Sequence, residues 1–186
     1  MNAANLTRVS GSECMVQLVS TSKQDNGHYC GPATVRQTLL YFKSQVSGYY
    51  NLFVPTQSTL AGETYLNTDL TESTDMTKIA PVLNPILGAY QYSLISIGTQ
   101  DDWINKVTYA LYVKKPVILD IKAVAGSGWP YTSDGHFLNV SGYDRTSSTH
   151  RAQVTDPWEG KLGSHWYDTS LVYSVNNAHW RRSMIW

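Results

Sequence analysis

Cys30 is the side chain whose position most clearly suggests chemistry. It ends a polar turn in the stretch QDNGHYCGPATVRQTLLYF, residues 24–42, and opens an apolar segment with helical spacing. Pro32 suits the first turn of that helix, where its missing N–H costs nothing. A cysteine at a helix N-terminus meets the positive end of the helix dipole, which favours the thiolate. The pattern indicates a sulfur nucleophile, and a disulfide with Cys14 stays open as the alternative.

A thiolate nucleophile needs a partner that holds and moves protons, and histidine is the usual one. Among five histidines, His136 has the best context, because it opens the strand-like run HFLNVSGYD after a glycine-rich loop. His28 is interpreted as a surface residue of the turn before Cys30. The remaining three lack a supporting context: His150, His165 and His179.

Asp156, in VTDPW, is suited to orient the imidazole by accepting its second N–H. Two strand-like runs, HFLNVSGYD and RAQVTDPW, flank the turn RTSST, so we expect them to pair as a hairpin. That pairing would bring His136 and Asp156 to the same end of the sheet. Two other carboxylates are rivals, but Asp144 lies at the far end of the hairpin and Asp134 lies in the loop.

Attack on a carbonyl creates an oxyanion, which needs hydrogen-bond donors that are in place beforehand. The backbone N–H of Cys30 can be one donor, because a helix N-terminus leaves it unpaired. The side-chain amide of Gln24, six residues earlier, is a candidate for the second donor.

The elements that must position these residues follow from hydrophobic periodicity. Thr99 is expected to cap a helix, Ser73 or Thr74 to cap another, and Pro81 and Pro85 to interrupt the latter. Helices concentrate in the first two-thirds and strands in the last third, which indicates an α+β class. Expected helices are 30–42, 58–66, 73–87 and 99–115, and expected strands are 15–21, 90–98, 116–123, 136–144, 151–158 and 179–186.

Composition excludes several classes of protein. With 186 residues we expect one domain over 14–186, preceded by a flexible arm over 1–13. Lys plus Arg and Asp plus Glu both total 14, so no basic excess suggests nucleic-acid binding. No apolar run is long enough to span a membrane, and no signal peptide is visible. A chain with 13 Tyr and many Ser, Thr and Asn residues is typical of secreted proteins, so a secreted or extracytoplasmic location is expected.

Together these residues resemble the C39-like branch of the papain-like cysteine peptidases. Gln24 precedes CGPA by six residues, and VTDPW follows the histidine of GHFLNVSGYD by about twenty. STDMTKIAPVLN is similar to the helix after the nucleophile helix in bacterial members, and KPVILDIKA is similar to the strand before their histidine loop. The resemblance covers roughly residues 16–175.

The resemblance implies a papain-like α+β fold, in which an N-terminal helical part packs on a C-terminal antiparallel sheet. It implies a stand-alone bacterial cysteine peptidase that hydrolyses a peptide or amide bond through a thioester. The expected partner is a peptide or protein substrate, with no cofactor and a monomeric state. The implied catalytic roles are Cys30 as nucleophile, His136 as general base, Asp156 as orienting carboxylate and Gln24 as oxyanion donor.

The expected substrate groove is rimmed by the glycine-rich loop AGSGWPYTSDG and by TDPWEG. Aromatic side chains in these segments are candidate walls, and two glycines beside the reacting residues complete the expected set. The set comprises Gly31, Gly135, Trp129, Tyr131 and Trp158.

Three alternatives stay open. The same triad supports deamidation, transglutamination or acyl transfer in papain-like toxins and effectors, because these reactions share the thioester step. A catalytically unused binding module is the second alternative. A zinc site of His28 and Cys30 with His136 or Asp156 is the third, although the spacing matches none of the usual structural zinc patterns.

Overall fold

The computed structural model describes residues 14–89, 91–146 and 148–186, so the expected arm over 1–13 lies outside the described residues. The elements in chain order are β1 (Cys14–Val16), α1 (Cys30–Gln45), α2 (Gln57–Ala61), α3 (Thr68–Thr71), η2 (Met76–Lys78), α4 (Ile79–Leu87), β2 (Leu94–Ser96), α5 (Gln100–Tyr112), β3 (Val117–Ala123), β4 (Ser133–Asp144), β5 (Arg151–Asp156), η3 (Glu159–Lys161), β6 (Gly163–Asp168), α6 (Thr169–Ala178) and β7 (Ser183–Ile185).

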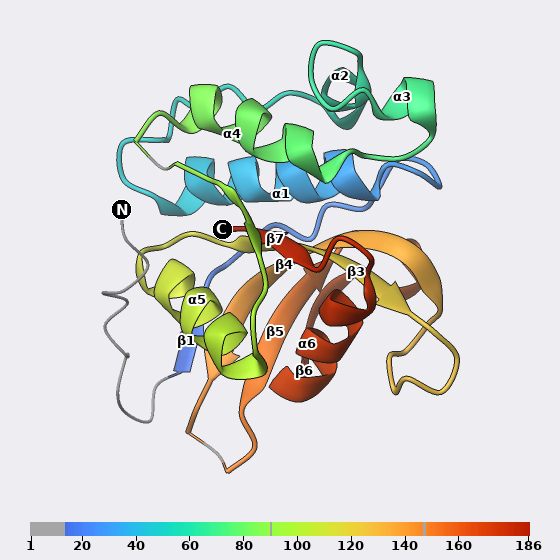
Figure 1. Ribbon diagram of the computed structural model, residues 1–186. Helices are drawn as coiled ribbons and strands as arrows, with labels where there is room; N and C mark the ends of the chain where they lie inside the picture. The colour runs from blue at the N-terminus through green and yellow to red at the C-terminus, as the bar shows by residue number, and fades with distance from the viewer. Residues whose placement is uncertain (1–13, 90, 147) are drawn as a thin grey trace.

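Within the described residues, seven strands form one sheet, in the order β2-β7-β3-β4-β5-β6 with β1 paired to β4. Every pairing is antiparallel (Figure 1). The hairpin expected from the run around RTSST is present as β4 and β5, with Asn139 opposite Thr155. The molecule therefore combines helices with an antiparallel sheet.

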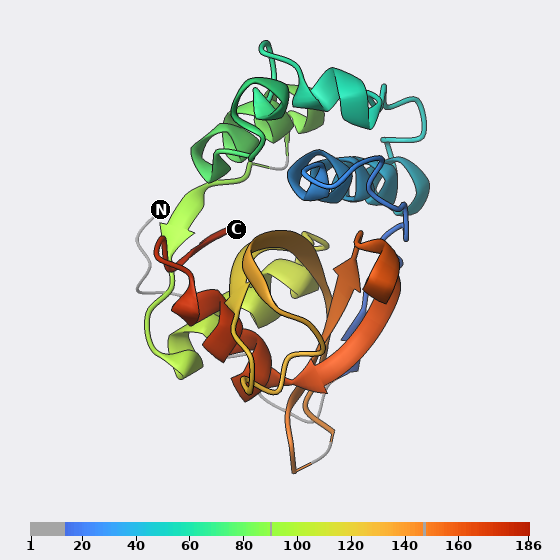
Figure 2. The same cartoon turned by 90° about the vertical axis from the view of Figure 1, so that its right-hand side faces the viewer.

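Helices cover both faces of the sheet. Figures 1 and 2 show α1 to α4 as a layer over one side, with α5 and α6 packed on the other. Strand β3 serves both layers: Ile118 joins Phe137 in the core under the helical layer, and Leu119 joins Leu138 in the core against α5 and α6. Because alternate residues of a strand point to opposite faces, Asp120 points to the same side as Ile118.

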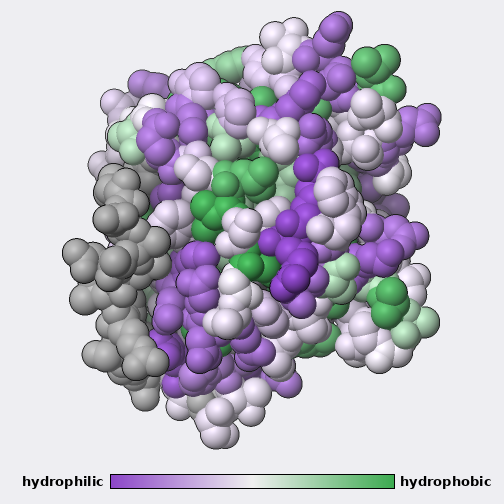
Figure 3. All heavy atoms as spheres, in the orientation of Figure 1, coloured by the Kyte–Doolittle hydropathy of each residue, from purple (hydrophilic) through white to green (hydrophobic). Residues whose placement is uncertain are grey.

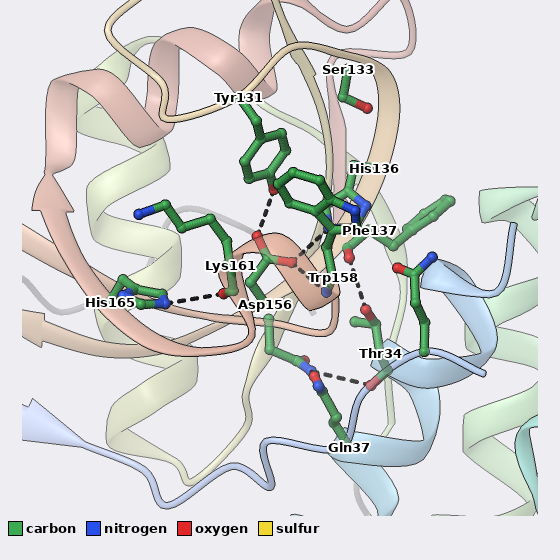
Figure 4. Close-up of polar contacts among 12 residues, drawn as sticks. Thr34, Gln37, Tyr131, Ser133, His136, Phe137, Asp156, Trp158, Lys161 and His165 are labelled. Atoms are coloured by element: carbon green, nitrogen blue, oxygen red, sulfur yellow. Dashed lines mark hydrogen bonds and ion pairs between the residues drawn. The ribbon is translucent and has the colours of Figure 1, made fainter. Parts of the chain in front are cut away.

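A buried polar network fixes α1 on β4. Asn139 Nδ2 donates to the carbonyl of Thr34 at 3.1 Å and to Gln37 Oε1 at 3.2 Å, while its Oδ1 accepts from Thr38 Oγ1 at 2.8 Å. The Thr34 hydroxyl donates to the carbonyl of Phe137 at 3.0 Å (Figure 4). Residues at the start of α1 and at the start of β4 are thereby held in a defined relation.

The segment around α4 differs from expectation at its start and at its prolines. Asp75 is the N-cap, and its carboxylate accepts from Thr77 N–H at 3.0 Å, so the expected caps Ser73 and Thr74 are wrong. A short 3-10 turn comes first and the α-helix continues through Pro85 to Leu87. The proline does not end this helix because packing of buried apolar residues outweighs the lost backbone hydrogen bond.

Several other expected elements are shorter, and some elements were missed, among them the short helices α3 and η3. Strand β1 (Cys14–Val16) shares only residues 15–16 with the expected strand 15–21, and β7 covers only Ser183–Ile185 of 179–186. Helix α2 begins at Gln57 and ends at Ala61, short of the expected 58–66. Helix α5 begins after the Thr99 cap as expected but ends at Tyr112. Strand β6 and helix α6 were missed, so the last third of the chain is not strands alone.

Over the face shown in Figure 3, hydrophilic and hydrophobic residues are interspersed, and the hydrophobic ones gather in small patches. Within residues 14–89, 91–146 and 148–186, no helix combines the length and apolar character that crossing a membrane requires.

Candidate active site

Cys30 is the first residue of α1, at a helix end that side chains leave uncovered. The N-cap Tyr29 makes no side-chain cap hydrogen bond, and no acidic residue lies in the first turn. The Ala33 N–H donates to the carbonyl of Tyr29 at 2.8 Å, whereas the N–H groups of the two residues before Pro32 have no partner within the helix. The Cys30 thiol is half-buried and free, and Cys14 is also free and exposed, so the disulfide alternative is wrong.

His136 and Asp156 lie together, where the start of β4 meets the end of β5. His136 Nε2 lies 2.8 Å from Asp156 Oδ1, and both side chains are buried (Figure 4). Asp156 accepts two further hydrogen bonds, from the Tyr131 hydroxyl at 2.5 Å and from the Trp158 N–H at 2.9 Å. The carboxylate is therefore fixed on three sides and can hold the imidazole in one orientation.

The electrostatics of His136 connect it to Cys30. Burial is the largest effect on the His136 pKa and lowers it, but the hydrogen bond that the ring donates to Asp156 and the interaction with the Cys30 side chain outweigh burial and raise the pKa to about 10. Since Nε2 faces Asp156, Nδ1 is the ring nitrogen left for Cys30. This arrangement can hold a proton transferred from the thiol.

Gln24 lies beside the same corner of the site. Its backbone N–H donates to the carbonyl of Pro157 at 2.9 Å, next to Asp156 in the chain. Its side-chain Nε2 donates to the carbonyl of Asn26 at 2.7 Å, and its Oε1 has no hydrogen-bond partner among the described residues. An amide nitrogen carries two hydrogens, so one N–H of Gln24 is left for another acceptor.

Gln57 supports the segment that carries Gln24, a role the sequence did not suggest. Its Oε1 accepts from the Asp25 N–H at 3.0 Å, and its Nε2 donates to the carbonyl of Lys23 at 2.6 Å. A buried glutamine at the start of α2 therefore braces the chain on both sides of the proposed oxyanion donor. A lone glutamine in a weak helical pattern gives no sequence signal for such a contact.

A cleft of about 380 Å³ opens beside Cys30, and its lining includes Gly135 and Phe137 of β4. The predicted aromatic walls are absent from that lining.

Tyr131 instead holds Asp156 and contacts the ring of Trp158 at a centroid distance of 4.6 Å. Trp129 is buried against Tyr131 and Tyr167, so it packs in the core. Trp158 is 38% exposed, and its role as a substrate contact stays a prediction.

The two predicted glycines have different environments. A Cβ at Gly31 would lie 2.1 Å from Thr74 Oγ1, so this position must be glycine for α1 to pack against the segment before α4. Gly135 lines the cleft, where a Cβ would be in ordinary contact with its neighbours. Close packing explains Gly31 without any contact to substrate, whereas Gly135 stays a predicted substrate contact.

A second histidine–carboxylate pair lies in the same cleft and was missed from the sequence. His179 Nε2 lies 3.3 Å from Asp120 Oδ2, and both residues line the cleft with Cys30. His179 follows the unforeseen helix α6, and Asp120 is one polar residue in an apolar strand, so neither stood out. Across the described part of the chain, no three His, Cys, Asp or Glu side chains converge as metal ligands.

These features agree with a defined family. The sequence matches the Peptidase_C39 like family over residues 14–183, so the chain belongs to this family. Family membership supports a peptidase, as the resemblance implied. A search of the curated proteins finds no match.

The fold has a counterpart among solved structures. The crystal structure of UfSP from C. elegans matches with a TM-score of 0.56 and 15% sequence identity over 97% of this chain. The match covers 35% of the UfSP chain, so this chain spans about a third of that protein's length. Together with the family, this likeness confirms the expected papain-like α+β fold.

Proposed function

We propose that the protein is a cysteine peptidase that hydrolyses a peptide or amide bond with Cys30 as nucleophile. The observation that carries the proposal is the relation of His136 to its two neighbours: Nε2 lies 2.8 Å from Asp156, and the Cys30 side chain interacts with the ring. A base between a thiol and an orienting carboxylate is the arrangement that nucleophilic catalysis requires.

In the proposed mechanism, His136 takes the proton of Cys30 and the sulfur attacks the substrate carbonyl. The resulting oxyanion accepts hydrogen bonds from the Cys30 N–H and from the remaining amide N–H of Gln24. His136 then donates its proton to the leaving amine, and a thioester forms. Water, deprotonated by His136, attacks the thioester and releases the carboxylic acid with the thiol restored.

The raised His136 pKa supports this sequence of steps. An imidazolium with a pKa of about 10 keeps its proton at neutral pH. Asp156 accepts a hydrogen bond from that imidazolium and favours it further. His136 can therefore hold the proton that it takes from the Cys30 thiol in the proposed mechanism.

Incubation with a proteome-derived peptide mixture, read by mass spectrometry, tests the reaction. Wild type is expected to generate new peptide termini, and Cys30→Ala to generate none. Cys14→Ser is the matched control and is expected to cleave as wild type does, because Cys14 is exposed at the edge of the sheet. Products with glutamate in place of glutamine, or joined through new isopeptide bonds, would instead indicate deamidation or transfer.

A further inference from the structure

Asp120 and His179 form a buried pair that the proposed mechanism does not use. Asp120 is 5% exposed and His179 is 4% exposed. Asp120 lies on β3, the strand next to β4, and His179 directly follows α6. The His136 backbone N–H interacts with the Asp120 carboxylate, and Asp120 lies opposite Phe137, the residue after His136, in the β3–β4 pairing. The pair is therefore adjacent to the proposed general base.

Each member of the pair has one polar atom without a hydrogen-bond partner among the described residues. These atoms are Asp120 Oδ1 and His179 Nδ1. Burial, followed by the charges of Arg181 and Lys122, lowers the pKa of His179, so the imidazole is neutral at pH 7. His179 Nε2 lies 3.3 Å from Asp120 Oδ2, a contact that favours the tautomer with the proton on Nε2, and in that tautomer Nδ1 is an acceptor. Each of these two buried acceptors can take a hydrogen bond from a donor outside the chain, a water molecule or a ligand.

The space beside these atoms is open to the cleft. Asp120, His179 and Cys30 all line it, together with Gly135. A Cβ at Gly135 would lie 3.7 Å from Asp120 Oδ1 and 3.8 Å from His179 Nε2, so the glycine leaves room for a ligand atom beside the pair.

The charge of the cleft favours a cation. Arg181 is paired with Asp75 at 3.3 Å, and Lys122 is paired with Asp134 at 3.1 Å. Two carboxylates that line the cleft, Asp120 and Glu72, have no Lys or Arg ion-pair partner among the described residues, and of these two only Asp120 is buried. Burial raises the pKa of Asp120 to about 7, against the opposing charges of Arg181 and His136. A buried carboxylate of this kind gains when a cation arrives.

We propose that Asp120 and His179 form a substrate subsite for a protonated primary amine close to the carbonyl that Cys30 attacks. The inference rests on the proposed function and adds a substrate class to it. The ammonium is either a lysine side chain or a free peptide N-terminus. It donates hydrogen bonds to Asp120 Oδ1 and His179 Nδ1, and its charge offsets that of the carboxylate.

Peptidyl acyloxymethyl ketones test the subsite on the full chain. The Cys30 sulfur forms a C–S bond to the methylene carbon, and the carboxylate leaves with the electrons of the broken C–O bond. Three reagent pairs separate the sources of the amine. Lysine is compared with norleucine at the residue bearing the ketone, lysine with norleucine at the preceding residue, and a free with an acetylated N-terminus.

In at least one pair, the cationic reagent is expected to inactivate wild type about tenfold faster or more, because charge-assisted hydrogen bonds are the strong ones. Asp120→Asn is expected to reduce that ratio below about threefold. His179→Gln is expected to reduce it as well, and it serves if Asp120→Asn does not fold. Asp144→Asn, at the opposite end of β4, is the matched control and keeps the wild-type ratio.

Ratios near one for all three pairs in wild type would overturn the inference, as would a ratio that survives Asp120→Asn. In either case rapid inactivation at Cys30 by the neutral reagents would leave the proposed function intact. A Cys30 that reacts with none of the six reagents would contradict the proposed function, and the inference would fall with it.

Discussion

At the scale of single residues, Asp156 is the best-anchored group in the site. Three hydrogen bonds reach its two carboxylate oxygens, from His136, Tyr131 and the Trp158 N–H. Burial, with the nearby charge of Asp156, raises the pKa of Tyr131, so its hydroxyl stays a donor over the whole working pH range. Tyr131 is thus a positioning residue that acts through Asp156.

Tyr131→Phe is expected to lower kcat about tenfold, because it removes a hydrogen bond to a charged group and allows Asp156 to turn. Asp156→Asn is expected to lower kcat by about a hundredfold or more, since His136 loses its charged partner. Steady-state kinetics on a peptide found in the proteome experiment measures both. Tyr112→Phe, at an exposed position at the end of α5, is the matched control, and a Tyr131→Phe enzyme with unchanged kcat would contradict the positioning role.

The juxtaposition of His136 and Asp156 could be predicted from the sequence, because two strand patterns around one turn leave a single plausible pairing. Strands β4 and β5 do pair, and His136 Nε2 lies 2.8 Å from Asp156 Oδ1. The pair of Asp120 and His179 could not be predicted in this way. Its members come from β3 and from the turn after α6, and their contact depends on how α6 docks on β3. No local sequence pattern encodes that docking.

At the scale of elements, the site depends on how α1 meets the segment before α4. Gly31→Ala is expected to destabilise the protein by about 1–3 kcal/mol, because a Cβ there collides with Thr74 and overpacks the contact. Urea denaturation measures the change. Gly27→Ala is the control, since its Cβ meets nothing within 4 Å. Equal stability of the two variants would show that α1 packs differently.

The polar contact between α1 and β4 is the second determinant at this scale. Asn139→Leu is expected to lower the free energy of unfolding by about 2–4 kcal/mol, because Thr38, Gln37 and the Thr34 carbonyl lose a buried partner. Asn51→Leu, at an exposed position, is the control and is expected to change stability by less than about 0.5 kcal/mol. A near-neutral Asn139→Leu would mean that this network does not fix the helix on the sheet.

Element boundaries were the weaker part of the prediction. The cap of α5 at Thr99 follows from local chemistry, since its hydroxyl accepts from the Asp102 N–H. The start of the turn that leads into α4 does not follow from local chemistry. Three successive residues, Ser73, Thr74 and Asp75, are all suitable caps, and tertiary packing selects among them. Strand β6 was missed because its pairing with β5, rather than its own pattern, defines it.

At the scale of the whole molecule, the cleft lies where the helical layer meets the sheet. Cys30 comes from the helical layer, whereas His136 and Asp120 come from the sheet. The distance between nucleophile and base is therefore set by the packing of the two layers, which bury apolar residues on both faces of the sheet. The position of a papain-like site at such a junction could be predicted from the resemblance, but its lining could not.

Asp120 makes the stability of the whole fold depend on pH. Its pKa is about 7 in the folded protein and about 3.8 when exposed, so the folded state holds an extra proton between these values. The free energy of unfolding of wild type, relative to Asp120→Asn, is expected to fall by up to about 4 kcal/mol as pH rises from 4 to 8. Urea denaturation at pH 4.5, 6 and 8 measures this difference, and parallel curves for the two proteins would contradict it.

The alkylation rates of the two cysteines test the central claim, that His136 activates Cys30, most directly and without a known substrate. Iodoacetamide is added at pH 7, and peptide mass spectrometry follows Cys30 and Cys14 in the same molecule. Cys30 is expected to react about tenfold faster or more, although it is half-buried and Cys14 is exposed, and His136→Ala is expected to abolish this advantage. A Cys30 that reacts no faster than Cys14, or equally fast without His136, would contradict the account.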